Sequence, residues 1–123
     1  MNLKLQHAVV RTTNIKTARE FYIEKLGLVI LEEAENFFAA KAGAVRLTFF
    51  GGYEKQEITE EAKTGVSLIL RTENLDEAMK TAREKGIPVN GEVINIPGFH
   101  KFLEIEDPDG NILFLAEYEK EPV

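Results

Sequence analysis

The chain has 123 residues, of which 44% are hydrophobic and 29% charged, and this composition is typical of an ordinary globular domain. Its formal net charge of −6 disfavours binding to nucleic acid or to an anionic membrane, because both require a basic face. Without cysteine there are no disulfides or thiolate ligands, and without a long apolar run no membrane-spanning helix is expected, so a cytoplasmic protein is predicted.

The first half of the chain predicts a strand, a helix and then three strands. A strand over residues 3–11 leads to Asn14, a residue type that caps helices, and the helix is expected to end at Gly27. The apolar face of this helix comprises Ile15, Ala18, Phe21, Tyr22 and Leu26. The three strands are predicted at Val29–Glu33, Phe37–Ala42 and Val45–Phe50.

The second half repeats this order after a polar, charge-rich segment. A strand over Val66–Thr72 precedes Asn74, which with Glu77 forms the pattern of a capping box, and Gly86 is expected to end the helix. The apolar face of this helix comprises Leu75, Ala78, Met79 and Ala82. The three strands are predicted at Val89–Asn95, Phe99–Glu106 and Asn111–Tyr118, the last two joined by the turn sequence Asp107-Pro108-Asp109-Gly110.

The two halves also agree residue by residue. A constant offset of 60 places Arg11 on Arg71 and Asn14 on Asn74, and it also matches Thr12 with Thr72 and Ala18 with Ala78. One such unit has an uncovered sheet face, whereas two units that face each other cover it and leave a cleft. We therefore predict a single domain of module one (1–51), a linker (52–64) and module two (65–123).

Several of these residues together resemble the vicinal oxygen chelate superfamily, which includes glyoxalase I, bleomycin-resistance proteins, extradiol dioxygenases and fosfomycin-resistance enzymes. The residues that carry the resemblance are His7, Asn14, Phe21-Tyr22, Leu26-Gly27-Leu28 and Asp107-Pro108-Asp109-Gly110-Asn111. The resemblance implies an α+β fold of two βαβββ modules forming a curved mixed sheet around a central cleft. It also implies a homodimer.

Enzymes of that superfamily hold a divalent metal at four strand positions, which the resemblance carries over to His7, Arg46, Ser67 and Phe114. Only His7 is a good ligand, because arginine has no lone pair to offer, phenylalanine has no donor atom and a serine hydroxyl is a poor ligand. Catalytic zinc and two-histidine iron sites need three protein ligands. We therefore expect no metal and no other cofactor.

Period-two alternation predicts an apolar pocket with a few polar groups, which is common at small-molecule sites. The predicted ligand-binding residues are His7, Arg46, Ser67, Phe114, Phe50 and Phe102. Arg46 has two interpretations: a clamp for a ligand carboxylate or phosphate, or a salt bridge to an internal acid such as Glu104. His7 has three: a general base, a hydrogen-bond donor to ligand, or a histidine satisfied by Ser67 or a backbone carbonyl. His100 is interpreted as an exposed residue at a loop rim.

Three functions fit the sequence. The first is a metal-independent small-molecule-binding protein of the bleomycin-resistance type, which sequesters or senses a partly aromatic ligand. The second is a glyoxalase-like lyase or related enzyme that uses His7 with an atypical or absent metal, although no catalytic residue is assigned. The third is an interaction module with a vestigial pocket. The expected partners are a small-molecule ligand and a second copy of the chain, with no nucleic acid and no membrane.

Overall fold

The computed structural model of the chain describes residues 1–54, 66–98 and 100–119. The chain divides into two compact units, Met1–Glu57 and Ile58–Val123, which are called here the first and second modules and are described separately. Most of the predicted linker (52–64) lies outside the described residues, so its bounds stay a prediction.

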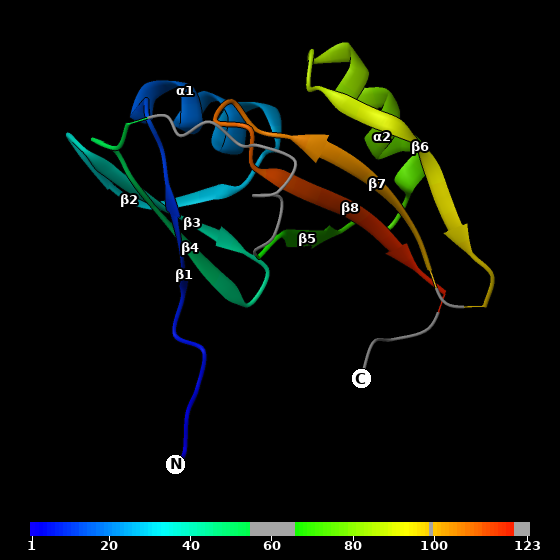
Figure 1. The fold of residues 1–123 in the computed structure, drawn as a ribbon, viewed down its shortest axis with the longest axis horizontal. Coiled ribbons are helices and arrows are strands. Elements are labelled where there is room, and N and C mark those ends of the chain that lie inside the picture. The colour runs from blue at the N-terminus through cyan, green and yellow to red at the C-terminus, as the bar shows by residue number, and fades with distance from the viewer. Residues whose placement is uncertain (55–65, 99, 120–123) are drawn as a thin grey trace. The chain divides into compact units, whose positions relative to one another are not determined.

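The first module contains one four-stranded sheet and one helical segment (Figure 1). Its elements are β1 (Ala8–Arg11), α1 (Ile15–Arg19), η1 (Glu20–Lys25), β2 (Val29–Ala34), β3 (Phe37–Ala42) and β4 (Val45–Phe50). The strand order is β1-β4-β3-β2, in which β1 runs parallel to β4 and the other pairs are antiparallel.

The second module repeats this topology (Figure 1). Its elements are β5 (Leu68–Arg71), α2 (Leu75–Glu84), β6 (Val89–Ile96), β7 (His100–Glu106) and β8 (Ile112–Tyr118). The strand order is β5-β8-β7-β6, again with one parallel pair. The predicted α+β class and the duplicated βαβββ pattern are therefore confirmed.

The repeated threonine and asparagine start the helix of each module in the same way. The Asn14 side chain accepts a hydrogen bond from Thr17 N (3.1 Å), and Asn74 accepts one from Glu77 N (3.1 Å). The backbone N–H groups of the two asparagines donate to Thr12 Oγ1 (3.2 Å) and Thr72 Oγ1 (3.4 Å). Asn74 is thus a cap as predicted, but Thr72 takes the role that a capping box would give to Glu77.

The first helix differs from a regular α-helix. After five residues of α1 the chain continues as the π-helix η1, in which Leu26 N donates to Phe21 O (2.8 Å). Two adjacent aromatic residues of this segment, Phe21 and Tyr22, are both buried. The Tyr22 ring lies 4.4 Å from the ring of Phe49, and Gly27 ends the segment with a φ of 77°.

The first strand of each module is shorter than the sequence predicts. Ala8 is paired with Leu47, and because β4 begins at Val45, residues before Gln6 have no partner in that strand. The prediction of a strand from residue 3 is therefore wrong. In the second module, too, the strand begins at Leu68 and not at Val66.

Each sheet has one face covered by its helix and one helix-free face. In the first module the covered face carries the stacked rings of Phe38 and Phe49, whose centroids are 4.4 Å apart. In the second module the covered face is aliphatic and comprises Leu103, Ile105, Leu113 and Leu115, all buried. The helix-free faces carry the predicted site residues. None of the helices in the described ranges is long and apolar enough to cross a membrane.

Candidate functional site

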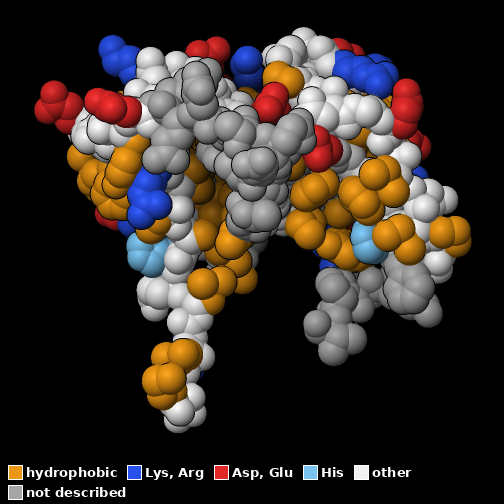
Figure 2. All heavy atoms as spheres, in the orientation of Figure 1, with side chains coloured by type: hydrophobic (Ala, Val, Ile, Leu, Met, Phe, Trp, Pro, Cys, Tyr) orange, Lys and Arg blue, Asp and Glu red, His pale blue; other side chains and the backbone are white. Residues whose placement is uncertain are grey.

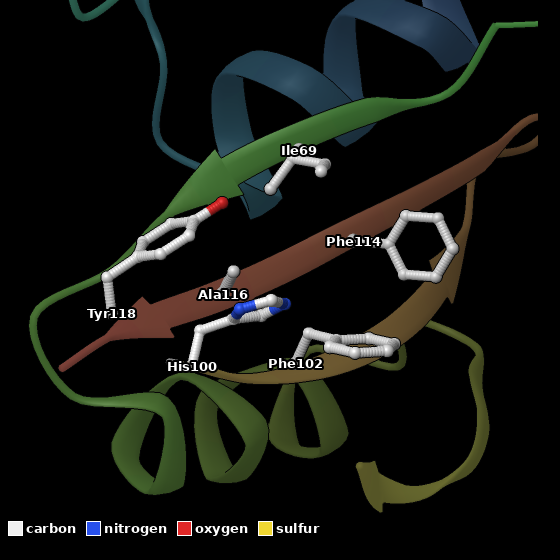
Figure 3. A pocket seen from close by; sticks show the side chains of 6 residues that line it. All are labelled: Ile69, His100, Phe102, Phe114, Ala116 and Tyr118. Carbon is white, nitrogen blue, oxygen red and sulfur yellow. The ribbon is translucent and has the colours of Figure 1, made fainter. Parts of the chain in front are cut away.

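A pocket of about 190 Å³ lies on the helix-free face of the second module. Six residues from β5, β7 and β8 line it, and they are called here the aromatic pocket: Ile69, His100, Phe102, Phe114, Ala116 and Tyr118. Figure 3 shows their side chains grouped on one face, with the small Ala116 between the larger ones. Figure 2 shows hydrophobic side chains crowding around a histidine on the surface of this module.

Strand register brings these residues together. Ile69 is paired with Phe114, Phe102 with Ala116, and His100 with Tyr118. Directly paired residues share a face, and so do alternate residues of one strand, so the six side chains must gather on one face. The pocket is therefore a direct consequence of where the bulky and small residues fall along β7 and β8.

The aromatic rings contact one another around the hollow. The Phe102 and Phe114 rings meet edge to face, with centroids 5.6 Å apart and an interplanar angle of 83°. The His100 ring lies 5.5 Å from Phe102 and 5.3 Å from Tyr118. Such rings keep each other in place and offer both π-faces and polar edges to a ligand.

Charged groups stand at the two ends of this pocket. The Arg71 guanidinium lies 5.6 Å from the Tyr118 ring centroid, within the range of a cation–π contact. At the other end Glu104 is paired with Phe114, and its Oε2 accepts a hydrogen bond from Asn90 Nδ2 (2.9 Å).

A second group of polar residues, called here the His7 network, lies on the helix-free face of the first module. Thr48 Oγ1 is 2.8 Å from His7 Nδ1 and accepts a hydrogen bond from Arg46 Nε at 3.3 Å. Arg46 also forms an ion pair with Glu32. Arg46 thus has an acidic partner within its own module, the half-exposed Glu32, where the salt-bridge interpretation had suggested the internal acid Glu104.

The remaining predicted site residues lie on the same two faces. The Phe50 ring is 5.8 Å from that of Phe37, at the far end of β4 from Arg46. Ser67 is exposed and precedes β5, whereas Phe102 and Phe114 both line the aromatic pocket.

The residues at the metal positions implied by the resemblance do not fit a metal. Val9 and Ile69 are equivalent positions of the two modules, since they are 60 residues apart. Thr48 is paired with Val9 and Phe114 with Ile69, so Thr48 is the equivalent of Phe114 in the first module, and Arg46 lies two residues before it. Neither Arg46 nor Thr48 is a useful metal ligand, because a guanidinium has no lone pair to offer and a hydroxyl is a poor ligand. Within the described residues of either module taken alone, no three His, Asp or Glu side chains gather in one place.

Four pocket residues are not among the predicted ligand-binding residues: Ile69, His100, Ala116 and Tyr118. The sequence contains a signal for each of them, because period two relates Ile69 to Ser67, His100 to Phe102, and Ala116 and Tyr118 to Phe114. The preceding Pro97-Gly98 suggests a loop rim at His100, although the residue also falls within the predicted strand Phe99–Glu106, and in the structure it is the first residue of β7 and half-buried. Its interpretation as an exposed loop residue is wrong.

Comparison with known proteins gives the class of this protein. A family model for the Glyoxalase/Bleomycin resistance protein/Dioxygenase superfamily matches residues 4–114. The chain belongs to this superfamily. No functionally curated protein shows a significant match to the chain.

Solved structures show the same fold at low sequence identity. A glyoxalase family protein from Enterococcus faecalis has a TM-score of 0.76 and 26% identity, over 93% of this chain and 97% of that one. A genomically encoded fosfomycin resistance protein from Listeria monocytogenes has a TM-score of 0.77 and 14% identity, over 95% and 94%. A glyoxalase/bleomycin resistance protein/dioxygenase from Alicyclobacillus acidocaldarius has a TM-score of 0.75 and 17% identity, over 93% and 90%. At this level of identity the likeness concerns the fold.

Proposed function

We propose that this protein binds a small, partly aromatic molecule and that the aromatic pocket holds the ring of that ligand. The observation that carries this proposal is the group of four aromatic side chains around the small residue Ala116 on a helix-free sheet face. Small-molecule sites typically combine such an apolar lining with a few placed polar groups.

The dimensions of the pocket favour one ring of the ligand. A cavity of about 150 Å³ suffices to bind benzene, so a hollow of about 190 Å³ accommodates a substituted ring. Each well-placed ring–ring contact contributes about 0.5–1.5 kcal/mol beyond the burial of area. Because the hollow is open on one side, the rest of the ligand extends beyond it.

The proposed ligand-binding residues are those predicted from the sequence, together with the four further residues that line the aromatic pocket. They are His7, Arg46, Phe50, Ser67, Phe102, Phe114, Ile69, His100, Ala116 and Tyr118. The residue types at the four implied metal positions support binding without a cofactor, because His7 alone among them has a good donor atom. A homodimer, a cytoplasmic location and a cleft shared by the two modules stay predictions. A glyoxalase-like enzyme is the alternative function, and metal analysis of protein purified without chelators addresses it.

Substitution of the pocket floor tests the proposal. Ala116→Leu adds three carbon atoms where the ligand ring is expected, so the affinity for a panel of small aromatic probes such as indole should fall at least tenfold. Isothermal titration measures this, and Ala34→Leu, at an exposed position of β2, is the matched control that should leave affinity unchanged. Equal binding of the probes to both variants would show that the ligand lies elsewhere.

A further inference from the structure

The hydroxyl of Thr48 determines which nitrogen of His7 carries a proton. Thr48 is only 2% exposed, and its Oγ1 contacts His7 Nδ1 at 2.8 Å and Arg46 Nε at 3.3 Å. A hydroxyl has one proton to donate, and the arginine Nε only donates, so Thr48 must accept from Arg46.

The Thr48 hydroxyl proton therefore needs a hydrogen-bond acceptor of its own. Over the described ranges of the chain, Thr48 Oγ1 contacts no acceptor other than His7 Nδ1. A buried hydroxyl proton without an acceptor is costly, so Thr48 donates to Nδ1. In a neutral imidazole whose Nδ1 accepts, the proton sits on Nε2.

Glu32 holds this arrangement in place from the other side. Its carboxylate pairs with a terminal nitrogen of Arg46, which turns the Nε–H of the guanidinium toward Thr48. The result is an ordered chain of donors and acceptors from Glu32 through Arg46 and Thr48 to His7. The direction of this hydrogen-bond series is opposite to that in a metal site. There, one ring nitrogen of the histidine donates to a neighbouring acceptor, which leaves the other nitrogen with a free lone pair for the metal.

The same face of the first module supplies further donors and an apolar surface. Lys41 is paired with Arg46, and Arg46 itself has N–H groups beyond the two that bond Thr48 and Glu32. Ala39 lies two residues from Lys41 along β3. Phe37 lies four residues from Lys41, and Phe50 lies four residues from Arg46 along β4. With a rise of about 3.3 Å per residue, the donors and the rings are separated by roughly 13 Å at the backbone.

From this geometry we propose that His7 is a hydrogen-bond donor through Nε2–H and that, with Arg46 and Lys41, it binds the carboxylate of an apolar or aromatic carboxylic acid. These three residues favour an oxyanion. His7 donates a hydrogen bond from Nε2–H, and the two cations, Arg46 and Lys41, donate charge-assisted hydrogen bonds. His7 then has no lone pair available for a metal ion. This inference does not rest on the aromatic pocket of the second module.

Nitrogen NMR of the full chain tests the tautomer. At a pH where both histidines are neutral, long-range proton–nitrogen spectra distinguish a protonated from an unprotonated ring nitrogen, with His100 as the internal reference. We expect His7 Nδ1 unprotonated and Nε2 protonated, and we expect Thr48→Val to mix the two forms at His7 alone. A wild-type His7 protonated at Nδ1 would overturn the proposal, and so would selective broadening of His7 signals by added Ni²⁺.

Binding of benzoate tests the ligand class. Arg46→Gln should weaken benzoate binding at least tenfold, since it removes a charged hydrogen bond, and Lys16→Gln removes a cation from α1 of the same module without effect. Uncharged benzyl alcohol should not perturb His7. Equal binding of benzoate to wild type and Arg46→Gln would contradict the site. If Arg46→Gln does not fold, the wild-type protein is titrated with benzoate instead. A saturable shift of the His7 signals supports the site, and the absence of a shift contradicts it.

Discussion

Asp107 is a buried acid that accepts hydrogen bonds within its own turn. Only 4% of it is exposed, and its carboxylate accepts hydrogen bonds from Asp109 N (2.9 Å), Asn111 N (2.8 Å) and Asn111 Nδ2 (2.9 Å). These bonds fix the turn that sends β8 back along β7, and Gly110 completes it with a φ of 84°. The sequence predicted this turn because aspartate, proline and glycine each favour a particular turn position.

We predict that Asp107→Ala lowers the free energy of unfolding by about 2–4 kcal/mol. The change removes the acceptor of three part-buried N–H groups, and hydrogen bonds to charged groups contribute about 1.5–3 kcal/mol each. Urea denaturation measures the loss. Asp107→Asn keeps one acceptor oxygen and should cost less, so an equal or larger loss in that variant would count against the role of the carboxylate.

Glu117 provides a pH-dependent contribution to stability. Its Oε1 accepts a hydrogen bond from Leu75 N (3.0 Å) at the start of α2, and this bond, helped by Lys101 at 3.5 Å, lowers the pKa of Glu117 below its ordinary value of 4.5. A carboxyl group with a lowered pKa in the folded state stabilises the protein above the unfolded pKa. That contribution disappears as the pH falls through the folded value.

Glu117→Gln should therefore reduce the acid sensitivity of folding. The midpoint of urea denaturation, followed from neutral pH downward, should fall less steeply in the variant than in wild type below about pH 4.5. Parallel curves for the two proteins would show that Glu117 does not titrate differently in the folded and unfolded chain.

At the scale of elements, the caps and stops were readable from the sequence, and the strand ends and the π-helix were not. Asn14, Asn74, Gly27 and Gly86 act locally, so their residue type alone indicates their role. The end of β1 depends instead on where its partner β4 begins, which is a long-range fact. The π-helix, with its bond from Leu26 N to Phe21 O, buries the same apolar residues that a regular helix would, so the hydrophobic pattern does not distinguish the two.

The cap of α2 gives a prediction at this scale. Asn74→Ala removes the acceptor of the Glu77 N–H and should lower the free energy of unfolding by about 1 kcal/mol, whereas Asn74→Gly should cost only a few tenths. Chemical denaturation of both variants measures the difference. If glycine costs as much as alanine or more, the side chain of Asn74 is not a cap in solution.

At the scale of the whole molecule, the segment before β1 exposes alternate apolar residues. Leu3 and Leu5 are 81% and 80% exposed, and Val9 in β1 is 49% exposed. Such a row is costly in water and is typical of a surface that meets another chain. It supports the proposed homodimer.

The Leu3→Ser, Leu5→Ser double variant should therefore shift the chain toward the monomer, because it removes about 2–4 kcal/mol of apolar burial at an interface. Sedimentation velocity at several concentrations measures the change, and Lys4→Ser, Gln6→Ser on alternate positions is the matched control. A wild-type monomer at high concentration would refute the dimer. An unchanged dimer in the leucine variant would place its interface elsewhere.

The sequence predicted the duplicated architecture of the molecule, because repeats and turn signals are local. It placed Phe102 and Phe114 on the helix-free face of the second module, but it did not define the pocket, which needs the register of β7 against β8. The partner of Arg46 could not be predicted for the same reason, since Glu32 reaches it across β3.

Residue-resolved mapping of a bound aromatic probe tests the central claim most directly. On titration with indole, the account predicts saturable shifts in the ring signals of His100, Phe102, Phe114 and Tyr118, lost in Ala116→Leu and kept in Ala34→Leu. Shifts that do not saturate, or that gather on residues outside this group, would contradict it.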